Sequence, residues 1–255
     1  MTGSQPLHFT RSSAARQDRT LPASLPSRRA GGADASGVPW LRRFRSSGLA
    51  LLLSMAGACA WAADWVIVPG QRAGPIDGAT SEAKLVELFG ASNITHEPFD
   101  VEPGVALPAT VVFAADRERR AVVLWRDAEK RTSPESVVIR GERTVWKTDK
   151  GITLGTPLAT LRRLNGKPLT LTGFGWDFAG TVIDSNGGTL VELGQDSQQG
   201  RVGRTLVVRL DPPPGLRDTP AYEQVLGERE FSSDSEAMRA LNPRVYELIV
   251  DIAPK

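Results

Sequence analysis

The pattern of apolar and polar positions predicts three short helices. In the first, Leu85, Leu88 and Phe89 fall on one face at helical spacing. Thr80 or Ser81 can cap the beginning of this helix, and Gly90 ends it. The three predicted helices cover residues 80–90, 156–166 and 233–241.

Short runs of β-branched and aromatic residues predict strands between and after these helices. The predicted strands cover residues 64–68, 94–99, 110–113, 121–125, 136–140, 169–172, 181–184, 189–193, 205–210 and 244–252. Pro98, Pro103-Gly104 and Pro108 predict a loop in the stretch after Phe99. In the last strand, alternation places Val245, Glu247 and Ile249 on one face. We therefore expect the α+β class, with short helices packed on an antiparallel β-sheet.

The order of a helix followed by strands occurs twice, and glycines mark both helices. The first set is Gly74, Gly78 and Gly90, and the second is Gly151, Gly155 and Gly166. The first two glycines of each set are 77 residues apart between the sets, and the glycines that end the helices, Gly90 and Gly166, are 76 residues apart. This pattern favours two tandem related halves, 63–148 and 149–255, although 25 glycines can also produce it by chance.

The two glycine-marked helix entries, residues 78–90 and 155–166, resemble modules of two families. These are the β-lactamase-inhibitor-protein-like group and the SmpA/OmlA-type outer-membrane assembly lipoproteins, whose G-x-S/T-x-x-x-V/L … G-x-P helix entry precedes a small antiparallel sheet. Lys167-Pro168 completes the second copy, whereas Ala91-Ser92 follows Gly90 in the first. The resemblance implies an α+β fold of repeated modules.

The chain also resembles an uncharacterised group of secreted bacterial proteins. The motif W-x-x-x-x-G-I-x-L-G occurs at residues 146–155, and L-x-G-F-G-W-D occurs at residues 171–177. This resemblance implies secretion and no particular activity.

A segment near residue 50 is typical of a cleaved signal peptide. Basic residues at positions 42, 43 and 45 precede an apolar run from Gly48 to Ala60, which is too short for a stable membrane span. Ala60 and Ala62 supply small side chains where signal peptidase cleaves. We therefore expect residues 41–62 to be a signal peptide cut after Ala62. The mature protein is then periplasmic or secreted, with no stable membrane span.

Two alternatives to cleavage after Ala62 stay open, a retained anchor and lipidation at Cys59. Lipidation is less favoured than the cut after Ala62, because Ala56 stands where a lipobox has Leu. Residues 1–40 are rich in small, basic and turn-forming residues without apolar periodicity, which predicts a disordered leader or a start site placed too early.

Removal of residues 1–62 reverses the net charge. The chain has 31 basic and 29 acidic residues, of which this segment holds 8 and 2, so 23 basic and 27 acidic residues remain, a net charge of −4. A nucleic-acid partner is therefore not expected. Cys59 leaves with the segment, and His96 is then the one histidine, so we expect no metal site and no cofactor. Nucleophile-elbow and phosphate-loop motifs are also absent.

The densest group of aromatic residues is the segment 173–180, with the sequence GFGWDFAG. In one interpretation the glycines permit a tight bend and the aromatic side chains fill the core. In the other, Phe174, Trp176, Asp177 and Phe178 form a binding surface. A pair of carboxylates, Asp177 with Asp184 or Glu192, would be needed for glycoside hydrolysis.

The expected function is that of an exported, non-enzymatic protein-protein interaction module that binds another protein of the cell envelope. The alternatives are an envelope carbohydrate-binding module that stacks on Trp176, and a carboxylate-based hydrolase near Asp177.

Overall fold

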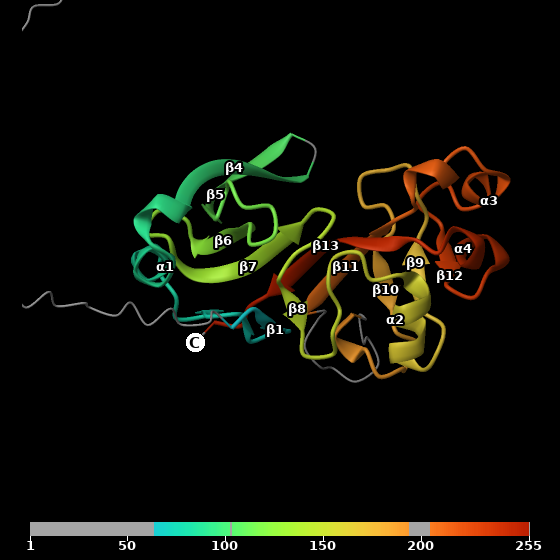
Figure 1. Ribbon diagram of the computed structural model, residues 1–255, viewed down its shortest axis with the longest axis horizontal. Coiled ribbons are helices and arrows are strands. Elements are labelled where there is room, and N and C mark those ends of the chain that lie inside the picture. The colour runs from blue at the N-terminus through green and yellow to red at the C-terminus, as the bar shows by residue number, and fades with distance from the viewer. Residues whose placement is uncertain (1–63, 103, 194–204, 255) are drawn as a thin grey trace, which may run out of the picture. The chain divides into compact units, whose positions relative to one another are not determined.

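A computed structural model of the protein describes residues 64–102, 104–193 and 205–254 (Figure 1). The predicted leader, the signal peptide, Cys59 and the cut after Ala62 lie outside these residues. Short helices and antiparallel strands make up the described part of the chain, which confirms the α+β class. Within it, no helix has the length and apolar character needed to cross a membrane.

Six strands form the main sheet, in the order β11-β13-β7-β6-β5-β4, and all neighbouring pairs are antiparallel (Figure 1). They are β4 (Ile94–Glu102), β5 (Val105–Val112), β6 (Ala121–Asp127), β7 (Thr132–Arg140), β11 (Leu206–Asp211) and β13 (Arg244–Asp251). The pairing of β7 with β13 joins strands more than 100 residues apart in sequence, so both parts of the chain build one sheet.

Two smaller sheets accompany the main sheet, in the orders β3-β2-β1-β8 and β10-β9-β12. Their strands are β1 (Val66–Val68), β2 (Arg72–Ala73), β3 (Ile76–Asp77), β8 (Lys147–Thr148), β9 (Thr170–Thr172), β10 (Val182–Asp184) and β12 (Glu230–Ser232). The pairing of β1 with β8 is parallel. An isolated bridge from Thr181 to Arg209 connects the chain before β10 to β11.

The predicted helices correspond to α1, α2 and α4 of the structure. The α-helices are α1 (Glu82–Phe89), α2 (Leu158–Asn165), α3 (Pro220–Glu223) and α4 (Glu236–Leu241), and the 3-10 helices are η1 (Ala91–Asn93), η2 (Val191–Leu193) and η3 (Pro214–Leu216). Ser81 caps α1 by accepting a hydrogen bond from the backbone N–H of Lys84. Gly166 ends α2 in the left-handed conformation, as a glycine can without strain.

The prediction of a loop in the stretch after Phe99, up to Pro108, is wrong. Strands β4 and β5 run through this segment, and Pro98 pairs with Pro108. Proline cannot donate a ladder hydrogen bond, so it is tolerated where one edge of a strand has no partner. Strand β4 ends the main sheet, and the pairing of β5 with β6 begins only at Thr110, so both prolines lie on such an edge.

The prediction of a strand over residues 189–193 is also wrong, because the structure has the 3-10 helix η2 there. Leu190 and Leu193 are both fully buried, and a spacing of three residues suits a 3-10 turn better than an alternating strand. The side chain of Asn165, the last residue of α2, accepts a hydrogen bond from the backbone N–H of Leu190 and so holds this segment.

Strand β13 departs from simple alternation at Tyr246. Arg209 pairs with Glu247 but its neighbour Leu210 pairs with Val245, so Tyr246 is an extra residue in a β-bulge. Val245 therefore packs in the large core cluster, and the prediction that it shares a face with Glu247 and Ile249 is wrong.

The two faces of the main sheet have different surroundings. On one face, which we call the helix face, Val123, Val137 and Ile139 pack with Leu85 of α1 and Leu161 of α2 in the large core cluster. We call the opposite face the groove face. Its smaller cluster consists of Ala109, Val111, Val122, Leu124 and Val138, with Phe99, Val101, Ala114 and Ile249 packed against it. No described helix contributes a residue to this second cluster.

Candidate functional site

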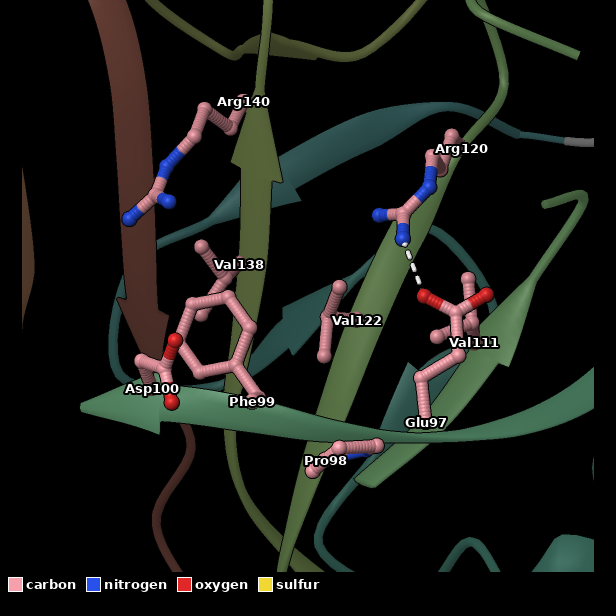
Figure 2. Close-up of a pocket in the computed structure, with 9 residues that line it drawn as sticks. All are labelled: Glu97, Pro98, Phe99, Asp100, Val111, Arg120, Val122, Val138 and Arg140. Carbon is pink, nitrogen blue, oxygen red and sulfur yellow. Dashed lines mark hydrogen bonds and ion pairs between the residues drawn. The ribbon is translucent and has the colours of Figure 1, made fainter. Parts of the chain in front are cut away.

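A pocket of about 330 Å³ opens on the groove face (Figure 2). Three valines from neighbouring strands, Val111, Val122 and Val138, supply its apolar part. Phe99 lines it from β4, the last strand of the sheet. The charged lining residues are Glu97, Asp100, Arg120 and Arg140. The pocket therefore combines an apolar floor with a charged rim.

Two arginines lie at one end of this floor, where Arg140 extends toward β13 and Arg120 extends toward Glu97 (Figure 2). The register of β6 with β7 pairs Val122 with Val138, so Arg120 and Arg140 stand one step further along the same face. Figure 2 shows both side chains on the same side of the two valines, with Phe99 and Pro98 of β4 on the other. Arg120 donates a hydrogen bond of 2.8 Å to the carboxylate of Glu97.

A row of charged residues continues across the sheet from Arg140. The side chain of Glu247 on β13 is 0% exposed and forms ion pairs with Arg140 on one side and Arg209 on the other. The guanidinium of Arg140 lies 5.4 Å from the ring centroid of Phe99, and that of Arg209 lies 5.3 Å from the ring centroid of Phe178. Both arginines are thus held by a carboxylate and an aromatic ring.

A second pocket, of about 300 Å³, continues the first one. Asp100 and Arg140 line both, and the second adds Val101, Gly104, Asp177, Phe178 and Arg209. Because the pockets share two residues, they are adjacent, and together their linings extend from Arg120 to Phe178. We call the two pockets together the sheet groove.

The structure separates the four aromatic-segment residues that the sequence singled out. Phe174 is 1% exposed and stacks on Tyr222 with ring centroids 6.0 Å apart, so its ring lies in the core. Trp176 is half-buried and packs edge-on against Phe178, and it donates a hydrogen bond to the carbonyl of Gly173. Asp177 and Phe178 line the sheet groove, so only these two of the four lie at it.

Close backbone contacts explain two glycines of this segment. A Cβ on Gly173 would lie 2.4 Å from the carbonyl oxygens of Val225 and Gly227, and one on Gly180 would lie 1.9 Å from that of Leu210. Gly180 also has a positive φ of 65°. Glycine is therefore required at both positions, as expected where a backbone approaches another closely.

The carboxylates that the sequence offered as partners of Asp177 have other contacts. Asp184 accepts a hydrogen bond from the backbone N–H of Asn186 in a turn, and Glu192 is ion-paired with Lys150. The acid that shares a pocket with Asp177 is Asp100. No group of three or more potential metal ligands occurs within the described ranges.

His96 contacts α1 rather than the sheet groove. Its Nε2 lies 2.9 Å from a carboxylate oxygen of Glu82, which also accepts a hydrogen bond from Thr110 and pairs with Arg131. Burial raises the pKa of Glu82, but the hydrogen bonds from Thr110 and His96 and the nearby charges outweigh this, and the pKa lies below its ordinary value. This cluster attaches the beginning of α1 to the sheet.

Sequence reasoning missed the arginines of the sheet groove. One signal was present, because Glu247 interrupts an otherwise apolar strand, and a buried carboxylate requires cationic partners. Which arginines these are depends on strand register, and register is a property of the fold.

In comparisons with known proteins, no family model matches the chain, and neither a curated protein nor a solved structure matches it significantly. The resemblances to inhibitor-like and lipoprotein modules therefore stay predictions.

Proposed function

We propose that this chain is an exported, non-enzymatic protein that binds another protein of the cell envelope through its sheet groove. The observation that carries this proposal is the exposure of two large apolar side chains of β5, Val105 and Leu107, next to a pocket with a valine floor. A strip of apolar side chains with a polar, charged rim is the usual composition of a protein-protein interface.

The apolar strip continues onto the hairpin of β4 and β5. Alternation along β5 puts Val105 and Leu107 on the same side as Ala109 and Val111. Val105 is 45% exposed and Leu107 is 40% exposed. Large apolar side chains exposed next to an apolar groove favour a surface that a partner covers.

The charged groups of the sheet groove suit recognition better than catalysis. Arg120 is paired with Glu97, and Glu247 is paired with both Arg140 and Arg209. Arginine and aromatic residues are enriched at the energetically dominant positions of interfaces. The predicted signal peptide at residues 41–62 is what supports export and an envelope partner.

We also propose that the chain consists of two related halves. The backbone N–H of Asp77 donates to Oγ1 of Thr80, and that of Thr153 donates to Oγ1 of Thr156, at 2.9 and 3.0 Å. These bonds align the two helix entries at an offset of 76, in place of the 77 between the leading glycine pairs. In each entry the N-cap residue of the helix, Ser81 or Pro157, pairs by an isolated bridge with the first residue of a later strand, β7 or β13.

A carbohydrate ligand is the second candidate, because Asp100, Asp177 and Phe178 line one pocket. Aromatic faces with nearby carboxylates can hold a sugar ring. Titration of envelope oligosaccharides into the wild-type protein and Asp177→Asn, followed by calorimetry, tests it. Binding that is lost in Asp177→Asn supports this candidate, and no heat with either protein rejects it.

The protein-binding proposal is tested with a photocrosslinking amino acid at Leu107, in the native envelope. Leu88 on α1 is the matched control, since it is the same residue type with a nearly equal exposure, 41% against 40%. A discrete crosslinked protein from position 107 and none from position 88 supports the proposal. Equal or absent crosslinks at both positions reject it.

A further inference from the structure

We propose that the free edge of β4, with the adjoining flank of α1, binds an extended segment of a partner protein as an added antiparallel strand. This inference rests on the relation between the two halves proposed above, and it uses a surface other than the sheet groove.

The first argument is what the chain itself does in the second half. Residues 212–243, between β11 and β13, contain α3, β12 and α4. Strand β12 pairs antiparallel with β9, on the edge of β9 that faces away from β10 (Figure 1). The same segment contacts one flank of α2, where Asp234 pairs with Arg162 and the side chain of Asn242 accepts a hydrogen bond from the backbone N–H of Ala159.

The first half has no counterpart of this segment. Only residues 128–131 connect β6 to β7. Strand β4 follows α1 and pairs with β5, as β9 follows α2 and pairs with β10. Within the part of the chain that the structure describes, no strand pairs with the other edge of β4. The edge that the chain covers in one half is therefore open in the other.

The matching flank of α1 is exposed as well. The offset of 76 places Ala83 and Val86 where α2 has the two residues that contact the segment 212–243. Ala83 is exposed, and Val86 is 36% exposed. Glu82 lies one turn before Val86 on the same flank, and its carboxylate is 2.9 Å from Nε2 of His96 on β4. This flank therefore adjoins the free edge.

The backbone of β4 offers hydrogen bonds at this edge. The N–H of Phe113 donates to the carbonyl of Asn93, so alternation directs the backbone groups of residues 95 and 97 toward β5 and those of residues 94, 96 and 98 away from it. The N–H of Ile94 donates to Ala91, and Pro98 has none. Three carbonyls and the N–H of His96 are left for an added strand.

This pattern favours a different protein over a second copy of the chain. In a pair of β4 strands centred on His96, Pro98 would face the carbonyl of Ile94 and supply no N–H. Only the two bonds between the two His96 residues would form. A segment without proline supplies all four bonds, because it has an N–H opposite each of the three carbonyls.

The side of the edge that faces α1 predicts apolar residues in the partner. Phe231, the central residue of β12, pairs with Leu171 and packs against the large core cluster. In the first half, a pocket of about 380 Å³ borders His96, and Pro98, Ala106 and Pro108 line it on the same side of the hairpin. Alternate residues of an added strand point to this side, so we expect them to be apolar.

The test is a selection of random 12-residue peptides, displayed internally in a carrier protein, against the full-length protein. Each selected peptide is then synthesised with one backbone nitrogen methylated at a time. Binding should be about tenfold weaker at every second residue of the paired stretch and nearly unchanged between them. In the complex, the amide of His96 should exchange with solvent about tenfold more slowly by NMR, whereas the amides of Thr95 and Glu97, which already bond to β5, should change little.

A pair of valine variants locates the site. Val86→Asp puts a charge on the exposed flank of α1 and should weaken peptide binding about tenfold. Val191→Asp is the matched control, since Val191 is 62% exposed on η2 in the second half, and it should bind like the wild type. Circular dichroism establishes that each variant is folded.

Four results would overturn the inference. These are the absence of any selected peptide, no alternation in the methylation series, an unprotected amide at His96 in the complex, and equal effects of the two valine variants.

The fate of the sheet groove is distinguishable. A Leu107 crosslink that persists in Val86→Asp, without protection of His96 by any peptide, leaves the groove as the one binding surface. A protected His96 without a Leu107 crosslink rejects the groove and supports the edge. Leu88 stays a valid control for the crosslink, because it lies about 200° around α1 from Val86.

Discussion

The helix face and the groove face of the main sheet are built by the same strands but have different surroundings. Val137 and Val138 are adjacent in β7, and both are almost completely buried, yet they belong to different core clusters. Helices α1, α2 and α4 cover the cluster of Val137. Phe99 and Val101 of β4 pack against the cluster of Val138, together with Ala114 and Ile249, and this cluster borders the sheet groove.

This difference shows that a run of apolar residues in a strand does not require a helix on both faces. The sequence Val-Val-Ile in β7 has the pattern of a strand buried on two sides. In this protein Phe99 and Val101 of β4 cover part of the groove face, and a pocket lies beside them on the same face. The valines of this face are almost completely buried, so the apolar side chains that a partner could cover are Val105 and Leu107 on β5.

The largest expected difference between the two faces comes from two leucine truncations. Leu161 of α2 is fully buried on the helix face, so Leu161→Ala should lower the free energy of unfolding by about 2–5 kcal/mol. Leu107 is 40% exposed, so Leu107→Ala should cost less than about 1 kcal/mol. Urea unfolding measures both. A cost at Leu107 equal to that at Leu161 would mean that the groove side is structural core.

Glu247→Gln tests the charged row of the groove face. The variant removes a buried negative charge and leaves Arg209, which is mostly buried, without its partner. We expect a loss of about 1–3 kcal/mol in the free energy of unfolding, because hydrogen bonds to charged groups contribute about that much. Glu118→Gln, at an exposed ion pair with Arg143, is the comparison and should change stability by less than about 1 kcal/mol. Equal effects of the two variants would argue against a structural role of the row.

Substitution of the two adjacent valines sharpens the comparison further. Val137→Thr buries a hydroxyl among helix-face side chains, with an expected loss of about 1–3 kcal/mol. Val138 is 2% exposed but lines a pocket, so a hydroxyl in Val138→Thr borders space that a water molecule could occupy, and the loss should be smaller than for Val137→Thr. Thermal unfolding compares them. The reverse order of stabilities would contradict the division into two faces.

The smallest effect is expected from pH. The pKa of Glu82 is lower in the folded protein than its ordinary value of 4.5, so ionised Glu82 stabilises the fold above that pH. This contribution is lost as the pH falls through the lowered pKa. Glu82→Gln should therefore lose less stability than the wild type between about pH 5 and pH 3. Melting temperatures across that range measure the difference, and parallel curves would contradict it.

Local signals predicted helices α1, α2 and α4 and most strands, because capping residues and apolar spacing act within a few positions of each other. The errors have tertiary causes. Pro98 and Pro108 are tolerated in strands because they lie on unpaired edges, and Tyr246 shifts the faces of β13 through a bulge. Neither the edge position nor the bulge leaves a mark within a few residues of sequence.

The candidate site was predictable only in part for the same reason. Asp177 and Phe178 were identified from an unusual local composition, and both lie at the sheet groove. Phe174 belongs to the same segment but points into the core. The direction of each side chain depends on the bend that Gly173 and Gly180 permit and on what packs against it.

By itself, the sequence determined the fold class and the positions of the main helices and of most strands. Apolar periodicity and capping residues are sufficient for these conclusions. Only the tertiary structure decided that Arg120, Arg140 and Arg209 meet on one sheet face, beside Phe99 and Phe178. These residues come from segments up to 110 positions apart, and strand register, which no local signal encodes, brings them together.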